Sequence, residues 1–307
     1  MVQHLLAPPI MTRAYPVMPG TTYMLTRQCV DRMFLLRPDK HSNQIFLYSL
    51  ARAARINGII LHAVTVMSGH PHVVYTDPLG RDPEFRRDLF ALVARAINAL
   101  RKRSGHCFAI ANHNTMVLVD EGAQLEAMAY VAAQPVAAGA VRYGYQWPGV
   151  RSKVEEFDKL RRVRRPNTSF FRNDTLPEHE SLMLVPPPGI RGEKWYVTAT
   201  IRAAIVSAEQ NARAAHARSG RPFEGRRAVR RTSCFRQPNS LQPSRRLNPR
   251  IKCHDLELRK AAKAALSAFW CAYYGALFEL RRGNRTVRFP HGTWRLRVYS
   301  GVECDSG

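Results

Sequence analysis

The order of strand-like and helix-like stretches in the first half of the chain is the feature that most limits the fold. Alternating or β-branched runs predict strands, whereas apolar residues three and four positions apart predict amphipathic helices. Glycines mark several boundaries, such as Gly58 after a helical pattern and Ser68-Gly69 between two strands. The expected elements are a strand at Thr21–Cys29, a helix at Asp39–Asn57, strands at Ile59–Met67 and His70–Tyr75, a helix from Asp82 to about Arg103, a strand at Thr115–Asp120, and a helix at Glu121–Ala133 that Pro135 is expected to stop.

This order reads β-α-β-β-α-β, followed by one more helix. It is the split βαβ or ferredoxin-like pattern, in which an antiparallel sheet carries helices on one face. We therefore predict an α+β fold with a ferredoxin-like sheet and an extra helix at Glu121–Ala133. Because one fold hosts many functions, the function has to be inferred from particular residues.

Charge is the strongest global signal in the composition. The 307 residues include 47 basic and 23 acidic residues, a formal net charge of +24, while a hydrophobic share of 45% is that of a globular protein. Such a surplus favours a polyanionic partner, most often nucleic acid, over neutral small-molecule chemistry. The alternative is an arginine-rich composition that only gives a solvated basic surface.

The second half of the chain concentrates this charge. Arg151–Arg165 holds seven basic residues, and Arg221–Lys252 holds ten against one acidic residue, with few apolar positions between them. The latter composition indicates a flexible or DNA-clasping linker. Helices are expected at Tyr196–Arg218 and Asp255–Arg282, and a terminal hairpin at Arg285–Tyr299.

Cysteine spacing and hydropathy point to a reduced protein without a membrane segment. The six cysteines form no C-x-x-C pair, so free thiols in the cytosol are expected. The N-terminus lacks the basic and apolar regions of a signal peptide. The longest apolar stretch, Ala264–Phe278, is too short to span a bilayer.

Two histidines stand two positions apart on a predicted strand. Residues i and i+2 of a strand point to the same face, so His70 and His72 are expected to direct both imidazoles at one spot. Two neutral imidazoles are a common way to hold a divalent metal. Taken alone, the pair fits ordinary surface histidines equally well.

A tyrosine and a glutamine stand four positions apart near the end of the helix at Glu121–Ala133. Residues i and i+4 share one helix face, so Tyr130 and Gln134 could meet the same ligand. If this helix packs beside the strand that carries His70 and His72, two imidazole nitrogens and one amide oxygen could hold Mg²⁺ or Mn²⁺. The alternative for Tyr130 is plain core packing.

Such a constellation suits phosphodiester transesterification. The phenolic oxygen of Tyr130 would attack phosphorus and leave a covalent phosphotyrosine and a free DNA hydroxyl. A metal would polarise the scissile phosphate and help neutralise the transition state. One ester replaces another, so a strand could be resealed without ATP.

Three sequence stretches resemble the single-tyrosine HUH transposase family, and most of all its branch associated with repetitive extragenic palindromes (REP). They are GTTYMLTR from Gly20, HAVTVMSGHPH from His62, and MAYVAAQPVAAGAVRYGYQWPG from Met128. The resemblance covers about residues 20–149, a little under half of the chain. It implies the same ferredoxin-like fold.

The resemblance also implies roles for individual residues. His70 and His72 match the metal ligands of the family, Tyr130 its nucleophile, and Gln134 its third ligand position. The implied substrate is single-stranded DNA folded into hairpins, and the implied protein is a monomer or homodimer in the bacterial cytoplasm, associated with the nucleoid. The expected division is an irregular arm at 1–19, the catalytic domain at 20–150, and a basic, mainly helical DNA-binding region at 151–307 with a flexible linker at about 220–252.

Arginine and lysine clusters are the candidates for phosphate contact, because their charge suits a polyanion. They are Arg27, Arg101, Lys102, Arg103, Arg161, Arg162, Arg164, Arg165, Arg226, Arg227, Arg230, Arg231, Arg245 and Arg246.

Two other functions compete with a transposase. A domesticated or inactive copy would keep the scaffold and only bind hairpin DNA or RNA. A replication initiator or relaxase would use the same chemistry. The size of this chain and the absence of a G-x-x-x-x-G-K-[ST] motif from its sequence disfavour that function.

Overall fold

The computed structural model describes residues 14–171, 175–238 and 250–306. The described residues form two compact units, one from the parts of 1–18 and 260–307 that are described, and one from 19–259. Residues 151–259 therefore belong to the same unit as residues 19–150. The division into a catalytic domain and a DNA-binding region concerns function and stays a prediction.

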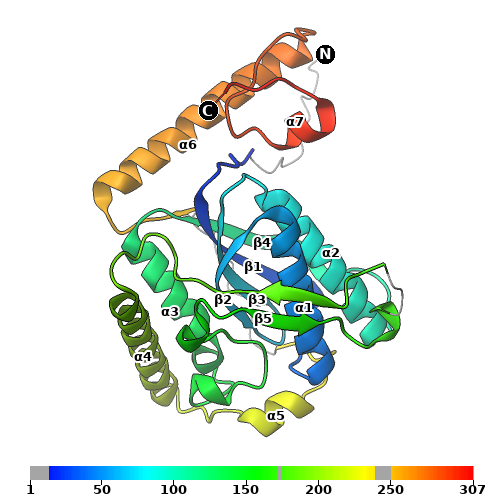
Figure 1. The fold of residues 1–307 in the computed structure, drawn as a ribbon, viewed down its shortest axis with the longest axis vertical. Coiled ribbons are helices and arrows are strands. Elements are labelled where there is room, and N and C mark those ends of the chain that lie inside the picture. The colour runs from blue at the N-terminus through cyan, green and yellow to red at the C-terminus, as the bar shows by residue number, and fades with distance from the viewer. Residues whose placement is uncertain (1–13, 172–174, 239–249, 307) are drawn as a thin grey trace, which may run out of the picture. The chain divides into compact units, whose positions relative to one another are not determined.

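A five-stranded sheet forms the centre of the larger unit, in the order β2-β3-β1-β4-β7 (Figure 1). The first four strands pair antiparallel, and β7 pairs parallel with β4. This arrangement confirms the α+β class and the ferredoxin-like strand order. The strands are β1 (Thr21–Cys29), β2 (Ile60–Val66), β3 (Pro71–Asp77), β4 (Phe108–Leu118) and β7 (Ile251–Lys252).

The hairpin between β2 and β3 closes at Ser68-Gly69, as the sequence predicts. The amide of Met67 donates to the carbonyl of His70 at 2.9 Å across this turn. Pro71 is the first residue of β3 and pairs with Val66. A proline lacks an amide donor, so the start of a strand is where a central strand tolerates it.

Two helices cover one face of the sheet, namely α1 (Lys40–Asn57) and α2 (Asp82–Leu100). The side chain of Asp39 caps α1 by accepting from the amide of Ser42 at 2.8 Å. Tyr75 of β3 packs against Phe85 of α2, with ring centroids 4.8 Å apart. Helix α2 ends three residues earlier than expected, because Lys102 has a φ of 50° and cannot continue it.

The extra helix, α3 (Glu121–Ala137), lies on the opposite face. His72 and Tyr75 stand three positions apart on β3 and so point to opposite faces, and His72 contacts Tyr130 of α3. Pro135 does not stop the helix, so the expected end at Ala133 was wrong. A proline in the last turn removes one hydrogen bond, and the helix still ends in regular bonding, because the amide of Ala138 donates to the carbonyl of Gln134 at 2.9 Å.

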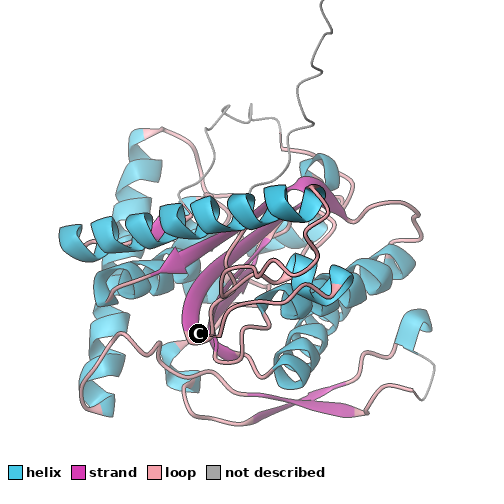
Figure 2. Cartoon of the chain, turned by 90° about the horizontal axis from the view of Figure 1, so that it is seen from above, coloured by secondary structure: helices cyan, strands magenta, loops and turns pink. Residues whose placement is uncertain are grey.

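The chain after α3 returns to the sheet. Residues 150–152 run along the outer edge of β2, where the amide of Val66 donates to the carbonyl of Val150 at 2.9 Å. Two short strands that the sequence did not reveal, β5 (Arg161–Arg164) and β6 (His179–Leu182), then form a separate ribbon (Figure 2). Glu180 of β6 is buried and holds the ribbon to α1 through Arg52 and Arg55.

Two further helices belong to this unit. Helix α4 (Lys194–Arg218) confirms the predicted helix and packs along α3. Helix α5 (Arg226–Arg231) lies within the stretch predicted as a flexible linker at 220–252, so that prediction was wrong for this part. Its one buried side chain, Val229, docks it on the protein, whereas residues 239–249 lie outside the described residues.

The smaller unit contains most of α6 (Leu256–Arg281), as predicted. The predicted terminal hairpin at Arg285–Tyr299 was wrong: its second half is a helix, α7 (Arg295–Ser300), and Phe289 forms a parallel bridge with Cys304 instead. Phe269 and Tyr273 of α6 serve packing here, whereas Tyr274 and Phe278 are exposed. The ring centroid of Tyr273, for example, lies 5.6 Å from that of the buried Phe289. Among the described residues, no helix is long and apolar enough to cross a bilayer.

Candidate active site

His70 and His72 lie side by side where the hairpin turn meets β3. Their ring centroids are 4.7 Å apart, with the planes at 78°. The Nδ1 of His72 shares a hydrogen bond of 2.9 Å with the hydroxyl of Thr26 on β1, the neighbouring strand. The Nε2 of His72 is buried and has no hydrogen-bond partner among the described residues. In the tautomer that donates Nδ1–H to Thr26, the ring presents the Nε2 lone pair to a ligand.

Burial keeps both imidazoles neutral at physiological pH. It lowers the pKa of His70 to about 4, and the nearby charge of Arg32 acts in the same direction. Burial also holds the pKa of His72 well below its usual value, helped by its neighbour His70. Neutral imidazole is the form that binds a metal, so the pair needs no deprotonation at pH 7.

Tyr130 reaches the histidine pair from α3. Its ring stands edge-on to the ring of His72, with the centroids 5.6 Å apart and the planes at 86°. The side chain is 46% exposed, unlike most aromatic residues of this unit. The phenol therefore has one side against a histidine and the other open to an incoming strand.

Gln134 lies one turn further along α3. The residue is buried, and the i to i+4 spacing places it on the face of the helix that carries Tyr130. The structure thus brings His70, His72 and Tyr130 together and places Gln134 on the same side of α3.

The residues present fit a divalent metal with a mixed set of donors. Among the described residues, no three histidine, cysteine, aspartate or glutamate side chains form a cluster that could hold a metal. A metal here would use His70, His72 and the amide oxygen of Gln134, with water or phosphate oxygens completing the shell. The buried Nε2 of His72, which lacks a partner among the described residues, is the observation that favours such a ligand.

Thr26 is the site residue that sequence reasoning missed. The stretch TTYMLTRQC predicts a strand but does not say which strand it pairs with. Only the antiparallel register, in which Thr26 stands opposite His72, brings its hydroxyl to the imidazole.

Some of the basic residues expected to bind DNA are instead used inside the protein. The Arg27 guanidinium stacks over Phe90, 4.8 Å from the ring centroid, and burial lowers its pKa. Arg101 is almost fully buried and donates to Asp39 at 2.8 Å. Arg103 donates to Asn98 and to a backbone carbonyl. These three arginines brace the end of α2 and the sheet, and only Lys102 of this group is exposed.

Other predicted DNA contacts lie on the surface. Arg165 donates to the carbonyl of Leu176, so its guanidinium is partly engaged. Arg245 and Arg246 lie outside the described residues. The exposed arginines among the candidates are Arg161, Arg162 and Arg164 on β5, and Arg226, Arg227, Arg230 and Arg231 on α5.

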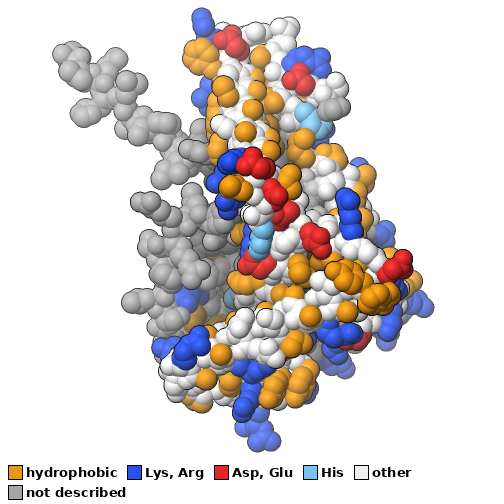
Figure 3. Space-filling model, turned by 90° about the vertical axis from the view of Figure 1, so that its left-hand side faces the viewer, with side chains coloured by type: hydrophobic (Ala, Val, Ile, Leu, Met, Phe, Trp, Pro, Cys, Tyr) orange, Lys and Arg blue, Asp and Glu red, His pale blue; other side chains and the backbone are white. Residues whose placement is uncertain are grey.

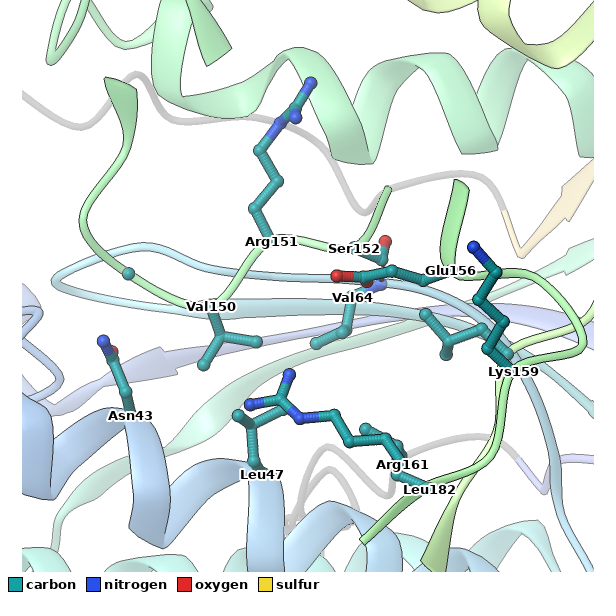
Figure 4. A pocket seen from close by; sticks show the side chains of 12 residues that line it. Asn43, Leu47, Val64, Val150, Arg151, Ser152, Glu156, Lys159, Arg161 and Leu182 are labelled. Carbon is teal, nitrogen blue, oxygen red and sulfur yellow. Dashed lines mark hydrogen bonds between the residues drawn. The ribbon is translucent and has the colours of Figure 1, made fainter. Parts of the chain in front are cut away.

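A cavity of about 270 Å³ lies between α1, the edge of β2 and the β5–β6 ribbon (Figure 4). Its floor is apolar, with Leu47 and Val64 among the lining side chains. Arg161 extends into it from β5, whereas Arg151 points away toward α3. It is separate from the histidine pair, because Leu47 belongs to α1, on the face of the sheet opposite α3.

No protein-family model and no curated protein matches the chain. Among solved structures, the chain is similar to a REP-associated tyrosine transposase bound to a REP hairpin, at 17% identity over 45% of this chain and 79% of that one, with a TM-score of 0.36. It is also similar to a candidate transposase from Deinococcus radiodurans R1, at 19% identity over 39% of this chain and 95% of that one, with a TM-score of 0.29. The first is named for the branch that the sequence motifs resemble, and the second only as a transposase. At these identities and TM-scores, the activity of this chain has to be inferred from its own residues.

Proposed function

We propose that the chain is a transposase that cleaves and rejoins single-stranded, hairpin-forming DNA through a covalent bond to Tyr130. The observation that carries the proposal is the contact of Tyr130 with His72, whose Nε2 is buried without a partner among the described residues. A solvent-open phenol against the buried imidazole of His72, with His70 beside it, is an arrangement that core packing does not require.

The reaction exchanges one phosphodiester for another. The Tyr130 oxygen forms a bond to phosphorus, the bond from phosphorus to a sugar oxygen breaks, and that oxygen leaves as a DNA hydroxyl. The phenolic proton passes to water, since no carboxylate or free imidazole stands at hydrogen-bond distance from the phenol among the described residues. The reverse attack by a DNA hydroxyl releases Tyr130 and reseals or transfers the strand.

The side chains of His70, His72 and Gln134 would hold Mg²⁺ or Mn²⁺. The bound metal would withdraw charge from the phosphate in the transition state. Thr26 fixes the ring of His72, so the ligand atom is already oriented before DNA arrives. Nitrogen ligands suit Mn²⁺ better than Mg²⁺, so we expect higher activity with Mn²⁺ at equal concentration.

The test is a covalent adduct. The protein is incubated with a single-stranded hairpin oligonucleotide labelled on either side of the expected cut, with Mg²⁺, Mn²⁺ or a chelator, and resolved on a denaturing gel. Wild type should give a shifted protein–DNA band that Tyr130→Phe lacks.

Tyr145→Phe is the matched control, because Tyr145 is 74% exposed and, within the part of the chain that the structure describes, its ring stacks only on Tyr143. Loss of one hydroxyl there should leave the adduct unchanged. If Tyr130→Phe gives the adduct as readily as wild type, the nucleophile assignment is wrong. If wild type binds the hairpin but forms no adduct with any metal, a protein that only binds DNA explains the data better.

A DNA substrate implies that the protein acts at the bacterial nucleoid, as a monomer or homodimer. Light scattering with and without hairpin DNA measures which of the two states is present. Mixing Tyr130→Phe with His72→Ala then reports whether one subunit completes the site of another: restored adduct formation requires a dimer.

A further inference from the structure

Helix α5 carries an exposed group of arginines that the fold does not use. Arg226, Arg227, Arg230 and Arg231 are all exposed, and none of their side chains takes part in a hydrogen bond or ion pair among the described residues. At 100° per residue, these positions form one continuous arc, and Val229 lies outside it. Lys and Arg side chains project at the lower end of the face in Figure 3, the end at which α5 lies in Figure 1.

Val229 anchors the helix in a small apolar cluster. It is 3% exposed and packs with Met67, Ala140, Val141 and Trp147. The amide of Gly225 donates to the carbonyl of Ala140 at 2.9 Å. On the other side of α5, Arg37 donates to the carbonyl of Thr232 at 3.2 Å, and the amide of Phe34 to the carbonyl of Arg236 at 3.1 Å. The segment 224–236 is therefore held at both ends.

This cluster joins α5 to both halves of the candidate active site. Met67 begins the turn that His70 closes, through their 2.9 Å backbone hydrogen bond. Ala140 follows the end of α3, where its amide donates to the carbonyl of Pro135, next to Gln134. The cluster that contains Val229 thus links α5 to the histidine turn and to the chain just after the tyrosine helix.

We propose that α5 is an arginine clamp that holds the single-stranded part of the DNA substrate beside Tyr130. The inference deepens the proposed function and rests on it. Guanidinium groups that the protein leaves unpaired are free for phosphate oxygens, and their fork geometry suits this ligand. A short, docked helix fixes their position relative to the site, which a flexible linker would not do.

The contrast with other arginines supports this partner. Arg151 is paired with Glu209 at 2.8 Å and Arg52 with Glu180 at 3.0 Å, as expected where arginine stabilises a fold. The α5 group instead concentrates four positive charges within six residues, with Glu224 as the one acidic residue nearby in sequence. Self-repulsion at this density is unfavourable unless a polyanion relieves it.

The experiment measures binding in a Tyr130→Phe background, so that cleavage does not intervene. Fluorescence anisotropy reports the affinity of the full chain for two oligonucleotides, one a hairpin with a long single-stranded flank and one the same hairpin with the flank removed. The test variant changes all four α5 arginines to Gln. The matched control changes four exposed basic residues of the other compact unit to Gln, namely Lys263, Arg281, Arg282 and Arg285.

The α5 variant should weaken binding of the flanked hairpin and flatten its salt dependence by about 3 log units of affinity per log unit of salt, from four lost phosphate contacts on a single strand. Binding of the trimmed hairpin and the control variant should change far less. Four Arg→Lys changes keep the charge and should preserve the slope. Thermal unfolding shows that each variant is folded.

Two results would overturn the clamp. In one, the α5 variant and the control variant change binding equally, so that only total charge matters. In the other, both hairpins weaken equally, which places α5 on the duplex stem instead. Neither result depends on adduct formation, so failure of the clamp and failure of the Tyr130 assignment remain separate outcomes.

Discussion

Protonation of the buried imidazole of His62 should make the protein lose stability in mild acid. His62 lies on β2, and its ring is almost fully buried. Its Nδ1 lies 2.9 Å from the carbonyl of Val185, and its Nε2 2.8 Å from the hydroxyl of Thr76. A carbonyl can only accept, so Nδ1–H donates, and the neutral ring accepts from Thr76. Burial lowers the pKa of His62 to about 4.

The sign and size of the effect follow from proton linkage. The unfolded chain binds a proton at this histidine near pH 6.5, whereas the native protein does so only near pH 4, so the free energy of unfolding falls as the pH drops between these values. From pH 7.5 to pH 5.0 the loss is about 2 kcal/mol for this one residue.

This loss is measured by urea unfolding of wild type and His62→Asn at pH 7.5 and at pH 5.0, with a chelator present. The variant should be less stable at pH 7.5 but should lose about 2 kcal/mol less than wild type on going to pH 5.0. His70 and His72 remain in both proteins, so their contribution cancels in the difference. His41→Asn, at an exposed position of α1, is the control and should retain the wild-type loss. Equal losses for wild type and His62→Asn would refute the reasoning.

Three further substitutions test the site and its supports. Thr26→Val keeps the side-chain shape but removes the hydrogen bond to His72, so the metal concentration for half-maximal adduct formation should rise about 10- to 100-fold, with the rate at saturating metal nearly unchanged. Asp120 caps α3 by accepting from the amide of Ala123, and it also accepts from the amides of His254 and Asp255 at 2.6 and 2.7 Å. Asp120→Ala removes all three hydrogen bonds, so denaturant unfolding should show a free energy of unfolding lower by about 2–4 kcal/mol. Val229→Ala deletes two methyl groups from the cluster that docks α5, worth about 1.6 kcal/mol, so amide exchange in α5 should accelerate by about tenfold while α1 is unaffected.

The local parts of the fold could be predicted from sequence because each carries its own signal. The order of elements along the chain, the turn at Ser68-Gly69 and the helix of Tyr130 all come from periodicity and turn residues within a few positions. The same holds for the i to i+2 spacing of His70 and His72, although their roles as metal ligands stay a prediction.

The parts that sequence missed depend on contacts between distant residues. Val229 is one apolar residue among arginines, so the composition of this stretch indicated a linker. Val229 nevertheless packs in a cluster with residues about 80–160 positions earlier in the chain. The β5–β6 ribbon depends on Glu180 meeting two arginines of α1. Pro135 was expected to stop the helix, yet α3 continues to Ala137, and the amide of Ala138 donates to the carbonyl of Gln134 at 2.9 Å.

Both margins of the central sheet are paired in part with chain that comes after residue 148. Residues 150–152 bond to β2 on one side, and the two-residue β7 bonds to β4 on the other. An open margin is a template for another chain, and a very short final strand that ends in lysine is a poor one. A fragment cut after the tyrosine helix would expose both margins and should self-associate edge to edge. The region that resembles a transposase therefore depends on its own distal sequence to cover the edges of its sheet.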